Sequence, residues 1–193
     1  LDGKLPVLKM AAVYGANGAG KSNLLKGINF LKAIALNKSF LDKESIGKYI
    51  FALKENAGTE PMELTIEFVT KNGIPYIYSV EIMNTGIVFE TLQISGLGSE
   101  ENRNIFTRKK GKIEYSVTPS EEVSNMVLGW IEKNPFSSLL TINNDMPVLT
   151  DENISIAQKW FEDELTIIGL YSFNPALIGI FKNNKEINQF ISN

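Results

Sequence analysis

The pattern of apolar and polar residues begins with a strand signature directly before a glycine-rich loop. Residues 7–14 (VLKMAAVY) form an apolar run with the length and branching of a buried central strand. After the loop, apolar residues recur every three or four positions from Leu24 to Ala35, which is typical of one face of a helix, and this pattern ends at Asn37. We therefore predict a strand, a glycine loop and a helix over residues 1–37.

The middle of the chain, residues 38–118, has the alternation of antiparallel strands. Residues 38–60 are mixed and polar, and we expect a surface excursion there. From Met62 onward, apolar and polar residues alternate, and turn signals at Asn72-Gly73, Asn84-Thr85-Gly86 and Lys110-Gly111 separate the alternating runs. The pattern predicts strands at residues 62–68, 76–82, 87–94, 105–107 and 113–117.

Residues 119–193 are predicted to be mainly helical. Ser120 is a helix-start signal before an apolar stripe that includes Val123, Val127 and Ile131, and a second helix is expected to start at Thr150 or Asp151. Residues 167–173 favour a short strand and residues 184–191 a last helix. Patterned segments run into both ends of the sequence, so we expect this chain to be a piece of a longer protein.

Composition restricts the chemistry. The 193 residues are 44% hydrophobic and 21% charged, which is ordinary for a globular domain, and the formal charge of -3 provides no global field for nucleic acid. The chain has no cysteine and no histidine, which excludes thiol nucleophiles, imidazole bases and Cys/His zinc sites. We find no membrane-spanning run and no signal peptide, and we expect a cytoplasmic protein without membrane contact.

The strongest chemical signal is residues 15–22 (GANGAGKS), which match G-x-x-x-x-G-K-[ST] without a mismatch. In this motif the glycines let backbone N–H groups surround phosphates, the lysine reaches the terminal phosphates, and the hydroxyl coordinates magnesium. Neither Asn-Lys pair of the chain continues into the Asn-Lys-x-Asp signature for guanine, so ATP with Mg²⁺ is the predicted ligand and Ser22 the Mg²⁺ ligand. The predicted binding residues are Gly15, Asn17, Gly18, Ala19, Gly20, Lys21, Ser22 and Asn23.

The residues in and after the loop add a family resemblance. Asn17-Gly18 followed by residues 21–28 (KSNLLKGI) resembles the SMC, RecF and OLD branch of ABC-type ATPases. Within that branch, the chain is most similar to bacterial AAA-family ATP-binding proteins of the abortive-infection type. The supporting segments are residues 88–92 (VFETL), 104–108 (NIFTR), 137–140 (SSLL) and 187–191 (INQFI).

This resemblance implies an α/β fold of the P-loop NTPase class, with residues 1–193 as the single N-terminal lobe of an ABC-type head that carries an antiparallel β subdomain. It further implies an ATP-hydrolysing head in the complete protein, a homodimer or higher oligomer formed through the heads, and control of a nuclease or toxin effector in phage defence. Nucleic acid remains an open partner. A non-catalytic, nucleotide-dependent interaction module and, less favoured, a transporter subunit remain alternatives.

No catalytic residue is identified in this chain. Residues 146–152 (MPVLTDE) resemble the apolar strand with a terminal Asp-Glu that holds magnesium in such heads, but Pro147 and Thr150 favour a helix entry capped by Thr150 or Asp151. The glutamine that senses the metal is also unassigned, its candidates being Gln93, Gln158 and Gln189. We expect the missing motifs beyond residue 193, so that this chain binds nucleotide without hydrolysing it.

Three further clusters are interpreted as structural. The basic group Arg103, Arg108, Lys109, Lys110 and Lys112 favours a solvated hairpin over a nucleic-acid contact. Residues 162–164 (EDE) favour the solvated face of a helix over a metal site. The two tryptophans, Trp130 and Trp160, are expected to be core or interface anchors.

Overall fold

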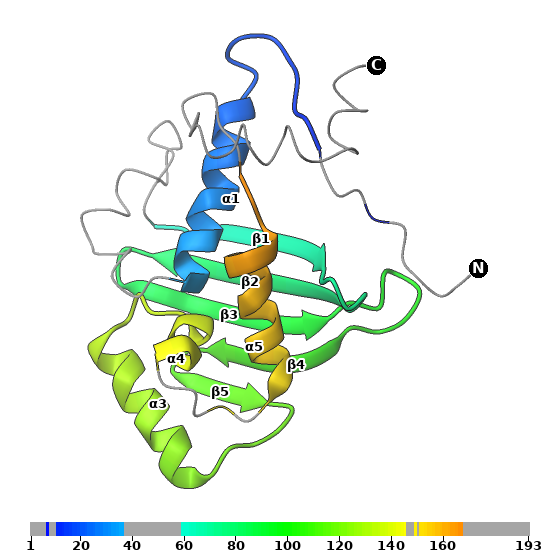
Figure 1. Ribbon diagram of the computed structural model, residues 1–193. Coiled ribbons are helices and arrows are strands. Elements are labelled where there is room, and N and C mark those ends of the chain that lie inside the picture. The colour runs from blue at the N-terminus through cyan, green and yellow to red at the C-terminus, as the bar shows by residue number, and fades with distance from the viewer. Residues whose placement is uncertain (1–6, 8–10, 37–58, 146–148, 150, 168–193) are drawn as a thin grey trace.

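A five-stranded antiparallel sheet with helices packed on it forms the body of the protein (Figure 1). The computed structural model describes residues 7, 11–36, 59–145, 149 and 151–167. The strands are β1 (Met62–Val69), β2 (Pro75–Met83), β3 (Gly86–Ile94), β4 (Arg103–Lys109) and β5 (Lys112–Tyr115). The helices are α1 (Lys21–Leu36), α3 (Glu121–Lys133), α4 (Leu139–Asp145) and α5 (Glu152–Lys159), and α5 continues into a π-helical turn, η1 (Trp160–Glu164).

The sheet is a meander in the order β1-β2-β3-β4-β5, so each strand pairs with its neighbours in sequence. The predicted turns connect these strands. Gly73 has a φ of 80°, and Lys110 and Gly111 have φ values of 49° and 73°, the left-handed pair that a two-residue hairpin loop requires. The antiparallel prediction is confirmed for the described residues, with β2 and β4 longer than the alternation indicated.

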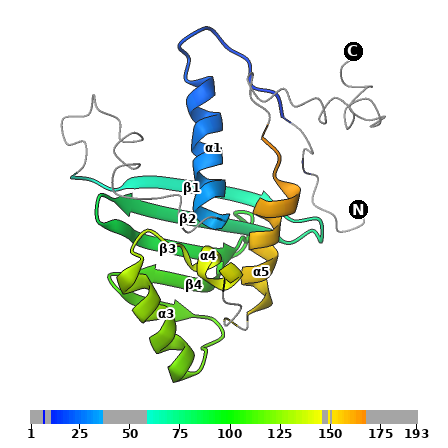
Figure 2. The ribbon, with the colours of Figure 1, turned by 60° about the vertical axis from the view of Figure 1, so that its left-hand side comes forward.

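Alternation along the strands gives the sheet an inner face, which the helices cover. Tyr76, Tyr78 and Val80 on β2 are fully buried, and Leu92 on β3 lies opposite Tyr78. Figures 1 and 2 show α1, α4 and α5 on the same side of the sheet. The buried residues of α1 are Phe30, Leu31, Ile34 and Ala35. The periodicity predicted Leu31, Ile34 and Ala35, but it did not include Phe30, and Leu24 at its start is 53% exposed.

Aromatic side chains of the α5–η1 segment pack against aromatic side chains of β1 and β2. The Trp160 ring stacks on Phe68 with the ring centroids 4.0 Å apart, and Phe161 packs edge-on against Phe68 and Tyr78. Lys32 of α1 donates a hydrogen bond to the carbonyl oxygen of Leu165, 2.7 Å away. Trp160 is therefore a core anchor, as expected.

The central strand expected at residues 7–14 is wrong for residues 11–14. These residues have no strand pairing, and Tyr14 and Val13 are 85% and 46% exposed. An apolar run indicates that burial of the segment would be favourable, but it does not specify which part of the protein would cover the segment. The five described strands pair only with each other, so none of them is paired with residues 11–14.

The two helix starts that the sequence indicated are confirmed, and one helix was missed. The Ser120 side chain accepts a hydrogen bond from the Val123 amide at the start of α3, and Asp151 caps α5. Helix α4 has only seven residues, and Leu139, Leu140 and Ile142 are all buried. Its sequence therefore lacks the helical spacing of apolar and polar residues from which a helix can be predicted.

Some predictions lie outside the described residues. These are the polar excursion at residues 38–58, the strand at 168–173, the last helix at 184–191, and Gln189. Within the described part of the chain, no helix combines the length and apolar character needed to cross a bilayer.

Candidate functional site

The loop that carries the sequence motif is curled, and its residues up to Gly20 are exposed. The Ala19 amide donates to the carbonyl oxygen of Ala16 at 3.2 Å, which closes a turn. Gly18 and Gly20 have φ values of 82° and 84°, and a Cβ atom placed on either would meet nothing within 4 Å. These two glycines are therefore required by the left-handed backbone conformation and not by lack of space.

The loop runs directly into the N-terminus of α1, a helix of 16 residues with no acidic side chain in its first turn. The amides of Asn23 and Leu24 both donate to the Gly20 carbonyl oxygen, at 2.9 and 3.1 Å. Among the described residues, the amides of Gly18, Lys21 and Ser22 have no hydrogen-bond acceptor. Free amides and the positive end of a helix dipole at one place form a good binding site for an anion.

The Lys21 ammonium group lies over this loop. Its Nζ donates to the carbonyl oxygens of Gly15 and Ala16 at 2.6 and 2.5 Å. A Cβ atom on Gly15 would lie 3.6 Å from Cδ of Lys21, which is ordinary contact, so the lysine stem covers the start of the loop. The charge is thus held at the start of the loop, and it can exchange the two carbonyl acceptors for a stronger phosphate acceptor.

Ser22 supplies the hydroxyl that a divalent cation needs. Its side chain is exposed in the first turn of α1 and makes no hydrogen bond within the described part of the chain. The eight predicted binding residues lie together on this loop and first helical turn, which is an arrangement that fits a polyphosphate and its cation. The described residues contain no cluster of three or more acidic side chains that would form an independent metal site.

Helix α1 is attached to the sheet through α4. The hydroxyl groups of Ser138 and Thr141 both donate to the Ile34 carbonyl oxygen, each at 2.8 Å. The Leu139 amide at the start of α4 donates to the two carboxylate oxygens of Glu90 on β3, at 2.9 and 3.0 Å. Glu90 therefore caps α4, and α4 holds the C-terminal end of the helix that carries the loop.

Glu90 belongs to a buried polar cluster. The Tyr78 hydroxyl donates to its Oε1 at 3.0 Å, and a guanidinium nitrogen of Arg108 lies 3.6 Å from its Oε2. Arg108 also donates to the Ser137 carbonyl oxygen at 2.8 Å. Burial raises the pKa of Glu90, and the charge of Arg108 and the amide of Leu139 oppose that rise.

The position of Arg108 contradicts the prediction that all five basic residues lie on a solvated hairpin. The sequence placed it with four other basic residues on a solvated hairpin, but it is 3% exposed and points into the core. Glu90 was missed as a site residue altogether. The sequence did contain a signal for this cluster, namely the segments on which the family resemblance rests. Glu90 lies in segment 88–92 and Arg108 in segment 104–108, and Ser137 and Leu139 lie in segment 137–140. Three segments that are separate in the sequence therefore meet at one cluster.

The Asp-Glu pair of residues 151–152 is used structurally. Asp151 accepts hydrogen bonds from the Asn153 amide at 2.9 Å and from the Ser116 hydroxyl at 2.8 Å. Burial alone would raise the pKa of Asp151, but these hydrogen bonds bring it below its usual value. The helix-entry interpretation is confirmed. Glu162 and Asp163 are exposed on η1, consistent with a solvated face, while Glu164 accepts from the Lys71 amide at 2.8 Å.

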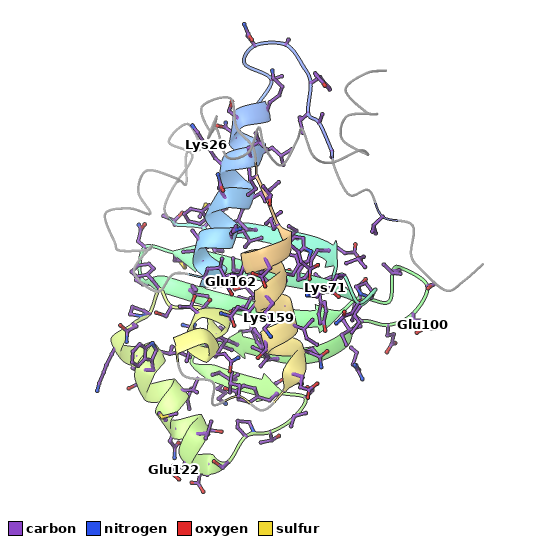
Figure 3. The ribbon with its side chains drawn as sticks, viewed as in Figure 1. Lys26, Lys71, Glu100, Glu122, Lys159 and Glu162 are labelled. Atoms are coloured by element: carbon purple, nitrogen blue, oxygen red, sulfur yellow. The ribbon has the colours of Figure 1, made fainter. Side chains whose placement is uncertain are left out.

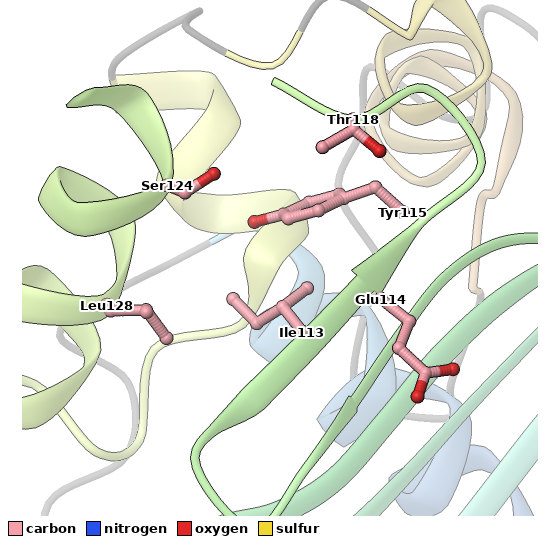
Figure 4. A pocket seen from close by; sticks show the side chains of 6 residues that line it. All are labelled: Ile113, Glu114, Tyr115, Thr118, Ser124 and Leu128. Carbon is pink, nitrogen blue, oxygen red and sulfur yellow. The ribbon is translucent and has the colours of Figure 1, made fainter. Parts of the chain in front are cut away.

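A hollow of about 320 Å³ lies between β5 and α3 (Figure 4). Among the described residues that line it, the acidic Glu114 is the only charged one, so the hollow does not suit a phosphate. Burial raises the pKa of Tyr115, which lies across this hollow, to about 12. The lining residues are Ile113, Glu114, Tyr115, Thr118, Ser124 and Leu128.

Comparison with known proteins gives one match. The model of the family described as "AAA domain, putative AbiEii toxin, Type IV TA system" matches residues 10–138, which include the glycine loop, α1, the whole sheet and Glu90. No curated protein matches the chain, and no solved structure matches it.

Proposed function

Because the chain belongs to this AAA-domain family and is therefore a P-loop NTPase, we propose that it binds ATP with Mg²⁺ on the loop of residues 15–22. The observation that carries the proposal is the set of unengaged amides at Gly18, Lys21 and Ser22 beside the Lys21 ammonium group. These donors belong to one short loop and the helix N-terminus that follows it, where a phosphate oxygen is a stronger acceptor than water or a carbonyl oxygen.

Each residue then has a separate task. The amides of the loop hold the phosphate oxygens, Lys21 leaves the carbonyl oxygens of Gly15 and Ala16 for the terminal phosphates, and the Ser22 hydroxyl coordinates the cation. Bound Mg²⁺ neutralises phosphate charge. The left-handed glycines already curl the loop, and the rearrangement that binding requires is the release of two carbonyl oxygens by Lys21.

Titration calorimetry with ATP and Mg²⁺ tests this proposal. Lys21→Ala should weaken ATP binding at least about tenfold, because a charge-assisted contact is removed. Lys26→Ala is the matched control, since Lys26 lies on the same helix with an exposed side chain (Figure 3) and should leave affinity unchanged. Equal affinity of the Lys21→Ala variant, or equal affinity for adenosine and ATP, would contradict the assignment.

We further propose that nucleotide binding joins two heads and controls a nuclease or toxin effector in phage defence. The support is the family membership together with the resemblance to SMC-like and OLD-like heads. ATP should add association of the full-length protein beyond any that exists without nucleotide, and Lys21→Ala should lose this ATP-dependent part. Association that is the same with and without ATP would count against the control of an effector by this site.

A non-catalytic nucleotide-binding module is the second candidate function. The observation that favours it is that Asp151, the carboxylate after the apolar run, is used as a helix cap. Phosphate release by this chain should then stay at the background of the Lys21→Ala variant. Turnover that Lys21→Ala abolishes would rule the non-catalytic role out.

A further inference from the structure

The outer face of the sheet carries one row of five residues with an unusual order. Glu63, Glu81, Phe89, Lys109 and Lys112 are register partners of one another from β1 to β5. Directly paired residues point to the same side of a sheet. The row therefore reads acidic, acidic, aromatic, basic, basic across the full width of the sheet.

Within the molecule, this order places like charges beside each other. Glu63 lies directly opposite Glu81, and Lys109 lies directly opposite Lys112. Like charges in direct cross-strand positions are destabilising, whereas a Glu–Lys pair at either place would stabilise the hairpin. In the described part of the chain, neither glutamate has an ion pair or a hydrogen bond, and Lys109 contacts only the Phe89 ring, with its Nζ 5.9 Å from the ring centroid.

In this row Glu63, Lys109 and Lys112 are exposed, and Glu81 and Phe89 are partly exposed. The neighbouring row on the same face consists of small hydroxyl side chains and ends in a glutamate: Thr65, Ser79, Thr91, Thr107 and Glu114. Figures 1 and 2 show the helices α1, α4 and α5 on the opposite face. At β5, Figure 4 shows Ile113 and Tyr115 directed toward α3 and Glu114 directed away from them.

The row is complementary to itself under one rotation. Strands are spaced about 4.8 Å apart, so Glu63 and Lys112 each lie about 10 Å from Phe89, on opposite sides. A half-turn about an axis parallel to β3, in the plane between two stacked sheets, brings Glu63 over Lys112 of a second copy and Glu81 over its Lys109. The two Phe89 rings then meet at the axis. The other in-plane axis, perpendicular to the strands, would place carboxylates on carboxylates.

We propose that two copies of this chain dock through the outer faces of their sheets, with a two-fold axis along β3 and the row Glu63, Glu81, Phe89, Lys109 and Lys112 as the contact. Such an interface is isologous, and sheets pack face to face about 10 Å apart, a gap that these long side chains fill. A nucleic acid fits the face less well, because Glu63 and Glu81 repel phosphates. A uniformly charged protein partner would match only one half of the row.

Charge reversal tests the proposal without nucleotide. In sedimentation experiments, wild type should dimerise, and more weakly as salt is raised, because its charge contacts are screened. We expect two double variants, Lys109→Glu/Lys112→Glu and Glu63→Lys/Glu81→Lys, to dimerise at least about tenfold more weakly. In each variant all charged residues of the row have the same sign and therefore repel those of the second copy. Mixing the two variants should restore a one-to-one dimer, because an all-acidic row then faces an all-basic row.

A cysteine on the axis provides a second measurement, because the chain has no native cysteine. Phe89→Cys should be joined to its symmetry mate by a bismaleimide whose arm spans about 10 Å, the separation of two stacked sheets, which is too wide for a direct disulfide. Thr65→Cys is the control, since its symmetry mate lies about four strands away, beyond the reach of that arm. A monomeric wild type, unaltered association of the reversal variants, failure of their mixture to associate, or equal cross-linking at both positions would overturn the proposal.

This interface is independent of the nucleotide site. Lys21→Ala should therefore dimerise as wild type does, so a failure of nucleotide binding and a failure of the sheet interface give different results. A shift of duplex DNA that depends on Lys109 and Lys112, without self-association of the protein, would instead make this face a nucleic-acid contact and reject the dimer.

Discussion

Glu90 and Arg108 lie opposite each other on neighbouring strands inside the core, with a guanidinium nitrogen 3.6 Å from a carboxylate oxygen and both side chains less than 5% exposed. The pair connects the sheet to the start of α4 through Leu139 and Ser137. Because α4 in turn holds Ile34 of α1, the helix behind the glycine loop depends on this buried cluster for its position.

Removal of one charge from the pair should be costly. Glu90→Gln keeps the shape of the side chain but leaves the Arg108 charge buried without its partner, and we expect a loss of about 3 kcal/mol in the free energy of unfolding. Urea titration followed by circular dichroism measures this loss. The double variant Glu90→Gln/Arg108→Met should recover part of it. A Glu90→Gln variant as stable as wild type would show that the ion pair contributes nothing.

Two glycines of the same region should respond in opposite directions to alanine. Gly20→Ala places a side chain at a φ of 84°, which costs about 1 kcal/mol and should also weaken ATP binding. Gly27→Ala, inside α1 with nothing within 4 Å of the new Cβ, should stabilise the protein by about 0.5–1 kcal/mol. Thermal unfolding and calorimetry of both variants provide the comparison. Identical effects at the two positions would argue against the left-handed loop.

Alkaline conditions should weaken the fold through Tyr76. Burial, with a further contribution from the charge of Asp151, raises the pKa of Tyr76 to about 12, above the value near 10 in the unfolded chain. The native state therefore retains a proton that the unfolded state loses, and stability that is complete below pH 10 falls as pH rises from 10 to 12. Urea midpoints at pH 9, 10 and 11 measure this fall.

The matched variants are Tyr76→Phe and Tyr14→Phe. Tyr76→Phe loses the hydrogen bond to Asn153, so it should be less stable at pH 9, yet its stability should fall less steeply above pH 10. Tyr14 is 85% exposed, and Tyr14→Phe should follow the wild-type curve. If Tyr76→Phe and wild type lose stability in parallel, Tyr76 is not responsible.

Replacement of Asp151 separates a capping role from a magnesium role. Asp151→Ala should cost about 1 kcal/mol, the usual effect of removing an N-cap, plus the loss of the Ser116 hydrogen bond. Asp151→Ser, which retains a capping oxygen, should recover most of the loss. The Mg²⁺ dependence of ATP binding should be unchanged in both variants, and a weaker Mg²⁺ dependence would assign Asp151 to the metal after all.

The prediction from sequence succeeded where the signal is local. The turn at Gly73 and the caps at Ser120 and Asp151 each rest on interactions over a few residues, and the structure confirms them. Prediction failed where an outcome depends on distant partners. Residues 11–14 have the composition of a buried strand but are not paired with any described strand. Helix α4 is buried, and its apolar residues do not recur with the spacing of an amphipathic helix.

The sequence by itself determined the phosphate-binding motif, the helix that follows it and the antiparallel succession of strands, because dihedral preferences, alternation and helical spacing act between near neighbours in the chain. Only the tertiary structure decided that Arg108 leaves the basic hairpin for the core and meets Glu90, and that two glutamates and two lysines lie at opposite ends of one row. Strand register fixes those positions, and register results from the packing of the whole sheet.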